Sequence, residues 1–151
     1  MRIEDAIQQK QFKNDFLKAD INIMYTASWL ALIKRQLLAD FDISWQQFNI
    51  LRILKGQFPN PSPLKNLSDR MIDRTSNTSR LVDKLVDKGF VERQLCSNDR
   101  RKLDIVITAK GLELLEEVSP VMEEGLTGIL GNLSKEEAGL LNQLLDKIRQ
   151  S

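Results

Sequence analysis

The 151-residue chain is one domain in size, and its composition favours a mainly helical protein. It has 22 Lys and Arg against 21 Asp and Glu, a net charge of +1, so any attraction to nucleic acid must come from a local patch. With no His and one Cys, the chain cannot build the usual zinc sites, catalytic triads or an intramolecular disulfide. We expect no metal, no cofactor and no catalysis. The N-terminal segment resembles no signal peptide, and no apolar run reaches the roughly 18 residues of a membrane span, so we expect a cytoplasmic protein.

Apolar spacing predicts long helices outside a compact middle. The stretch from Asp5 to about Ala39 has no Pro or Gly and predicts one long helix. Part of its apolar stripe is expected to face another chain, and packing against the C-terminal helix of the same chain is the alternative. A Ser-x-x-Gln capping box predicts a second helix from Ser44, ended by Gly56 and a Pro-rich loop. Ser62 is then expected to cap a short helix that reaches about Met71.

The next segments predict a helix, a hairpin and two further helices. A helix with an unusually long polar start is expected from Thr75 to Lys88, and Gly89 should end it. Alternating residues at 90–95 and 102–108 predict two strands joined by a charged tip. Thr108 is expected to cap a helix that kinks at Pro120, and a second capping box predicts a last helix from Ser134. This order is that of a winged helix-turn-helix, and the fold class is mainly α with a small antiparallel β-hairpin.

The charge distribution favours DNA as the partner of this middle part. Residues 62–111 carry 11 Lys and Arg against 7 Asp and Glu, a net +4, and the rest of the chain carries −3. The polar side of the 75–88 helix includes Ser76, Asn77, Arg80 and Lys84. Asn and Arg are suited to adenine and guanine edges, and hydroxyls to bases or phosphates. The alternative is a solvated helix face on which Arg80 and Lys84 pair with nearby Asp residues.

The tip of the hairpin adds a second candidate contact. At this tip, Asp99 precedes Arg100 and Arg101, and its carboxylate can orient a guanidinium toward a narrow minor groove. The same hairpin holds Cys96, which is interpreted as an unperturbed thiol in preference to a redox-active one.

Four segments together resemble the MarR family of bacterial transcription regulators. They are Thr75–Leu85, Lys88–Arg93, Asp99–Arg101 and Ile107–Gly111. The resemblance implies a homodimer with interlocking terminal helices, made of a helical dimerisation region at 1–40 and 112–151 and a winged helix-turn-helix at 41–111. It also implies binding to an inverted repeat of double-stranded DNA with half-sites about 10 base pairs apart. The family's Asp-x-Arg wing falls on Asp99 and Arg101, and Arg100 is expected nearer a phosphate.

The DNA-contacting residues expected on this basis come from the polar helix start and the wing. They are Thr75, Ser76, Asn77, Ser79, Arg80, Lys84, Asp99, Arg100 and Arg101. Asn77 stands where many family members have Thr, so the bases that it reads cannot be transferred from the family.

The family resemblance also implies a small aromatic or phenolic ligand, bound between the dimer helices and the winged helix. The candidate lining residues are Met24, Tyr25, Trp29, Trp45 and Phe48. Ordinary core packing of these side chains is the alternative, and the favoured one. The function predicted overall is a dimeric, sequence-specific regulator, in most family members a repressor, that a ligand releases from DNA.

Two alternatives come from other functional classes. One is a winged-helix module that binds protein through Glu92, Asp99 and the acidic C-terminal half, although the arginines of the wing argue against it. The other is an enzyme that uses Asp99 with Asp104, although these carboxylates are better suited to orienting Arg side chains.

Overall fold

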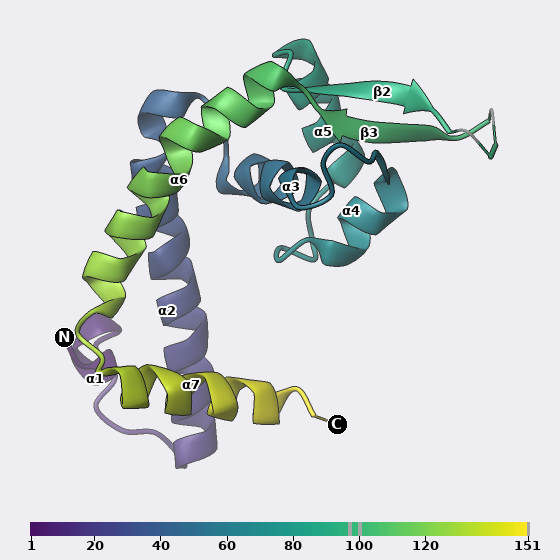
Figure 1. The fold of residues 1–151 in the computed structure, drawn as a ribbon. Helices are drawn as coiled ribbons and strands as arrows, with labels where there is room; N and C mark the ends of the chain where they lie inside the picture. Colours follow the sequence, from purple (N-terminus) through teal and green to yellow (C-terminus); the bar gives the residue numbers. More distant parts are fainter. Residues whose placement is uncertain (97, 100, 151) are drawn as a thin grey trace.

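The computed structural model describes residues 1–96, 98–99 and 101–150. Helices dominate it, with one small sheet in the middle of the chain (Figure 1). In chain order the elements are α1 (Ile3–Ala6), α2 (Asp15–Leu37), a 3-10 turn (Ala39–Phe41), α3 (Trp45–Lys55), β1 (Ser62–Pro63), α4 (Leu64–Arg70), α5 (Thr78–Asp87), β2 (Val91–Leu95), β3 (Leu103–Ile107), α6 (Ala109–Leu130) and α7 (Lys135–Ile148).

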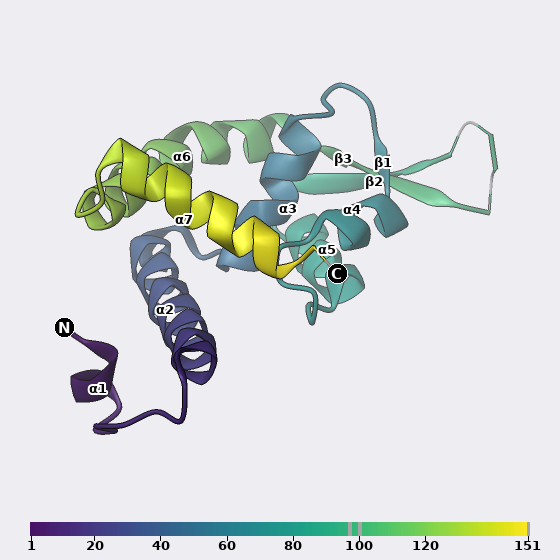
Figure 2. The ribbon, with the colours of Figure 1, turned by 90° about the horizontal axis from the view of Figure 1, so that it is seen from below.

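The molecule has a compact head and a helical stalk. Helices α3, α4 and α5 pack with the sheet in the head, while α2 and α6 run together away from it (Figure 1). Gly125 of α6 permits a close approach here, because a Cβ at this position would lie 2.7 Å from the Leu37 side chain of α2. Helix α7 leaves the far end of α6 in a new direction, which the view from below also shows (Figure 2).

The core of the head is built around α3. This helix buries Phe48, Ile50, Leu51, Ile53 and Leu54, so apolar side chains cover most of its circumference, as expected of a central helix. Its neighbours contribute Leu67, Met71, Val82, Leu85, Val91, Ile105, Ile107, Leu115 and Val118 to the same cluster. The predicted winged helix-turn-helix is therefore present, with α5 in the position of the recognition helix and the β2–β3 hairpin as the wing.

The wing hairpin has the predicted pairing, and the sheet gains one strand that the sequence did not suggest. Val91 pairs with Ile107 and Leu95 with Leu103 in antiparallel register. Ser62 and Pro63 add a short strand, β1, on the other side of β3. Ser62 was expected to cap α4, but Pro63 precedes that helix, and the buried Ser62 hydroxyl accepts a hydrogen bond from Asn66 at 2.7 Å.

Two predicted helix starts are wrong for local reasons. The single helix from Asp5 is broken, because Gln8 adopts a left-handed conformation (φ 55°) and Asn14 caps a new helix by accepting from the Leu17 amide at 2.9 Å. Helix α5 begins at Thr78 instead of Thr75, because Asn77 serves as its cap.

The other signals of helix start and end agree with the structure. Both capping boxes form, at Ser44 with Gln47 and at Ser134 with Glu137. Gly89 ends α5 with φ 77°, whereas α6 continues through Pro120 to Leu130. Among the helices described, none has the length and apolarity that crossing a membrane needs.

Candidate nucleic-acid interface

Helix α5 separates a buried side from a polar one. Val82 and Leu85 are fully buried against the core, while Ser79, Arg80 and Lys84 are exposed. The Asn77 Oδ1 atom accepts a hydrogen bond from the Arg80 amide at 3.1 Å and so satisfies one of the free amides of the first turn. The exposed side chains of Ser79, Arg80 and Lys84 therefore lie on a helix whose first turn is capped by Asn77.

The turn before α5 uses its polar groups within the protein. Both the amide and the hydroxyl of Thr75 donate to Asp73 Oδ1, at 3.0 and 2.7 Å, and Gln46 Nε2 donates to Asp73 Oδ2 at 3.1 Å. These bonds, from Thr75 first and Gln46 second, hold the pKa of Asp73 below its ordinary value. The hydroxyls of Ser76 and Thr78 are buried and have no hydrogen-bond partner among the described residues.

Five of the predicted DNA-contacting residues on α5 and in the turn before it divide into two groups. Ser79, Arg80 and Lys84 are exposed and free to meet a ligand, whereas the side-chain oxygens of Thr75 and Asn77 already accept or donate hydrogen bonds within the protein. The signal for this division was present in the sequence, since Ser, Thr and Asn are typical cap and turn residues.

Ion pairs and hydrogen bonds hold α5 to its surroundings. Asp83 pairs with Arg93 of β2, which connects the polar side of the helix to the base of the wing. The Lys88 ammonium, just after the helix, lies 3.2 Å from the Asp42 carboxylate, and the Lys88 carbonyl oxygen accepts a hydrogen bond from Lys110 at 2.8 Å. The recognition helix is therefore linked to the wing and to the neighbouring elements of the head.

The wing carries an arginine in the predicted arrangement. The Arg101 side chain is 93% exposed, and its Nε atom lies 3.5 Å from Asp99 Oδ1. The same carboxylate oxygen accepts from the Arg101 amide at 3.0 Å. Asp99 thus orients Arg101 and leaves its guanidinium in solvent; Arg100 lies outside the described residues. Asp104 lies in β3, within the sheet, and within the described part of the chain no group of three or more metal-ligating side chains gathers.

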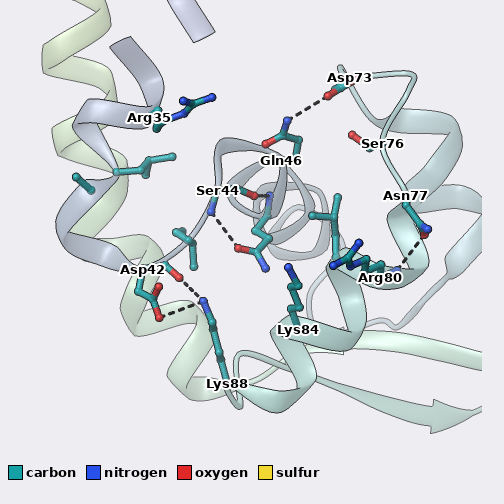
Figure 3. A pocket seen from close by; sticks show the side chains of 15 residues that line it. Arg35, Asp42, Ser44, Gln46, Asp73, Ser76, Asn77, Arg80, Lys84 and Lys88 are labelled. Carbon is teal, nitrogen blue, oxygen red and sulfur yellow. Dashed lines mark hydrogen bonds and ion pairs between the residues drawn. The ribbon is translucent and has the colours of Figure 1, made fainter. Parts of the chain in front are cut away.

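A crevice of about 720 Å³ lies between the end of α2, the start of α3 and the exposed side of α5 (Figure 3). Its cationic side chains outnumber its carboxylates. The cations are Arg35, Arg80, Lys84 and Lys88, and the carboxylates are Asp42 and Asp73. An anion is the ligand that this lining suits, and Arg80 and Lys84 serve both the crevice and the exposed side of α5.

The five predicted ligand-lining residues do not meet in one cavity. Tyr25 and Trp29, one helical turn apart on α2, line a shallow pocket of about 420 Å³ together with Arg35. Met24 is exposed on α2 and does not line it. Phe48 is buried in the core, and Trp45 packs against the core with Lys34 Nζ 4.8 Å from its ring centre.

Helices α2 and α7 expose a large apolar surface. Neither α2 nor α7, both wholly within the described residues, buries any of its residues in the single chain. The large apolar side chains exposed on the two helices are Phe16, Leu17, Ile23, Met24, Trp29, Leu32, Leu140, Leu141, Leu144 and Ile148. Soluble proteins rarely leave patches of this kind uncovered in their working state.

Comparisons with known proteins identify relatives of this chain. The MarR family model matches residues 43–103, which span α3 to the start of β3. The transcriptional repressor MprA of Escherichia coli K12 is 30% identical over 125 residues, which cover 83% of this chain and 71% of that protein.

Two solved structures share the fold. A mutant of Escherichia coli MarR, complexed with operator DNA, is 22% identical and covers 92% of this chain and 99% of its own, with a TM-score of 0.79. A structure of Bordetella bronchiseptica BpsR, from work on how 6-hydroxynicotinic acid regulates its DNA binding, is 22% identical. The match covers 85% of this chain and 91% of the BpsR chain, with a TM-score of 0.76. From its winged helix-turn-helix, its match to the family model and its identity to MprA, the chain belongs to the MarR family of DNA-binding transcription regulators.

Proposed function

We propose that this protein is a homodimeric repressor that binds an inverted-repeat operator and is released by a small anionic aromatic ligand. One observation carries the DNA-binding part. The head presents exposed Arg80 and Lys84 on α5 and exposed Arg101 on the wing, and each lies on an element that fits a groove of B-DNA.

The contacts divide by chemistry. Arg80, with Ser79 beside it, is proposed to read base edges in the major groove, because a guanidinium can donate two hydrogen bonds to guanine. Lys84 lies one turn further along α5 and is proposed to meet phosphate, as a point charge that carries little sequence information. Arg101, oriented by Asp99, is proposed to enter the minor groove. The side-chain oxygens of Thr75 and Asn77 are proposed chiefly to shape the start of α5.

The proposal of a dimer is based on the exposed apolar side chains of α2 and α7. Two helices without a buried residue need a partner, and a second copy of the chain offers a matching apolar surface. The dimer would present two copies of α5, which is what an inverted repeat requires. We therefore propose the dimerisation region expected from the sequence, residues 1–40 and 112–151.

The proposed ligand site is the cationic crevice beside α5. Its lining shares Arg80 and Lys84 with the proposed DNA contacts, so a carboxylate bound there would draw these cations away from DNA. The name of BpsR's regulator, 6-hydroxynicotinic acid, supports an anionic aromatic as the class, and the name of MprA supports repression. The smaller pocket at Tyr25 and Trp29 is the second place for an aromatic ring.

A pair of substitutions on α5 tests this assignment. Arg80→Ala should lose about 1–3 kcal/mol of discrimination between the operator and a variant with one changed base pair. Lys84→Ala should instead weaken binding to operator and scrambled duplexes alike. It should also lower by about 1 the salt slope, which is the steepness with which the logarithm of the binding constant falls with the logarithm of salt concentration. Lys135→Ala removes the same charge at the exposed start of α7, outside the head (Figure 1), and serves as the control. If Arg80→Ala keeps full discrimination, or wild-type binding is weak and insensitive to salt, the assignment is wrong, and the second outcome favours a protein-binding module.

A further inference from the structure

Asp73 lies in the turn between α4 and α5, and none of the DNA contacts proposed above uses it. Its two carboxylate oxygens have different partners. Oδ1 accepts from the amide and the hydroxyl of Thr75 within the turn, and Oδ2 accepts from Gln46 Nε2 on α3 at 3.1 Å (Figure 3). One side chain thus shapes the turn and fastens it to another helix.

A second hydrogen bond joins the same turn to α3. The Ile72 amide donates to Asn49 Oδ1 at 3.1 Å, and Asn49 is a buried residue of α3. Gln46 and Asn49 are three positions apart, so they lie on the same face of α3. Two consecutive residues of the turn are therefore bound by two neighbouring side chains of the central helix.

Helix α3 is the most rigid reference available in the head, because most of its residues are buried. Only a few residues separate Asp73 from Asn77, the cap of α5. A shift of the turn relative to α3 would therefore move the exposed residues of the first turn of α5, Ser79 and Arg80. Base reading depends on their position to within fractions of an ångström, whereas contact with phosphates tolerates more movement.

We propose that Asp73 is a positioning residue for sequence recognition, which acts with Gln46 to hold the start of α5 so that Ser79 and Arg80 meet the base edges. This inference rests on the proposed function. It assigns to Asp73 no contact with DNA. It also explains why a carboxylate stands on a side of the protein where a negative charge repels phosphate: the charge strengthens the hydrogen bonds that it accepts.

The electrostatic and positioning effects of removing Asp73 have opposite signs, which makes the test sharp. Asp73→Ala removes a negative charge beside DNA, so simple attraction predicts tighter binding to every duplex. Positioning predicts that affinity for the selected operator falls about tenfold, the size of one charge-assisted hydrogen bond, while affinity for a scrambled duplex of equal length stays or rises. The salt slope should stay unchanged, because no phosphate contact is lost.

Two further variants separate positioning from charge and from loss of stability. Asp69→Ala removes an exposed carboxylate of α4 that pairs with Lys65 on the same helix, so it is the matched control and should keep the ratio of operator to scrambled affinity. The double substitution Gln46→Glu with Asp73→Asn reverses donor and acceptor across the same gap and keeps the net charge of the wild type. It should recover most of the ratio that Asp73→Ala loses.

All affinities are measured below the onset of thermal unfolding of each variant. The inference would be overturned, while the proposed function stands, if Asp73→Ala kept the wild-type ratio of operator to scrambled affinity. It would also be overturned if the double variant had wild-type thermal stability but did not recover this ratio. If Asp73→Ala does not fold, Gln46→Ala removes only the bond from Gln46 to Asp73, and it must lower the ratio of operator to scrambled affinity severalfold or the inference fails. If the wild type itself prefers no sequence, both the function and the inference are wrong.

Discussion

Replacing Leu140 and Leu144 of α7 together by alanine should separate the dimer into folded monomers. The two side chains lie one helical turn apart and are 55% and 51% exposed in the single chain. The covered half of each side chain also supports the monomer, so its thermal stability should fall moderately, while its helix content should change little because alanine favours helix. Whatever the leucines contribute beyond this belongs to the interface.

The size of the effect follows from the exposed fractions. Burying a whole leucine side chain is worth about 1.5–3 kcal/mol, and about half of each surface is still available, so each leucine contributes about 1 kcal/mol at an interface. A two-fold dimer holds both residues twice, which makes the total about 4 kcal/mol. At about 1.4 kcal/mol for each factor of ten, the dimer dissociation constant should rise roughly 1,000-fold.

Sedimentation equilibrium over a wide concentration range measures this change directly. Asn142→Ala, exposed on the opposite side of the same helix, is the control and should leave the dissociation constant as it is. Operator affinity of the double variant should fall in parallel, because one head alone reads one half-site. An unchanged dissociation constant, or a wild type that is monomeric at all concentrations, would refute the assignment of α7 to the interface.

Three further predictions concern the head and the N-terminal segment. Arg101→Ala should weaken operator binding and lower the salt slope by about 1 without changing the mass of the dimer; unchanged binding by fluorescence anisotropy would remove the wing from recognition. Leu85→Ala, at a fully buried position of α5, should lower the free energy of unfolding in urea by about 2–5 kcal/mol, and a loss under about 1 kcal/mol would contradict the described core. The hydrogen bond from Lys18 is the main cause that lowers the pKa of Glu4 from 4.5 to about 2, so this link stabilises the fold above pH 4.5 and is lost as the pH falls toward 2. In Lys18→Met the Glu4 carboxyl should titrate nearer 4.5 by NMR, and an unchanged titration would exclude Lys18 as the cause.

The sequence predicted best those features that depend on local chemistry. The capping boxes at Ser44 and Ser134 fix two helix starts through bonds between residues three positions apart. The alternation at 90–95 and 102–108 predicted both strands of the wing, and Gly89 marked the end of α5. The order of these elements then sufficed for the fold, because few architectures accept it.

Features that depend on distant contacts were beyond this reasoning. Strand β1 exists because Ser62 meets Ile105 across the sheet, and no local pattern announces a pair of residues as a strand. The link from Asp73 to Gln46 joins residues that are 27 positions apart. In the same way the cationic crevice brings Arg35 of α2 together with Arg80 and Lys84 of α5. The core packing of Trp45 and Phe48, by contrast, is the interpretation that their helical spacing favoured. The break at Gln8 was hidden because no Gly or Pro marks it.

The decisive experiment for a dimeric, sequence-specific regulator is selection of duplexes from a random pool by the purified protein, with the mass of the selected complex measured in solution. We expect one enriched inverted repeat, with half-sites about 10 base pairs apart, bound by two copies of the chain with a steep dependence on salt. A pool that stays random, or an enriched site without two-fold symmetry bound by a single copy, would contradict it.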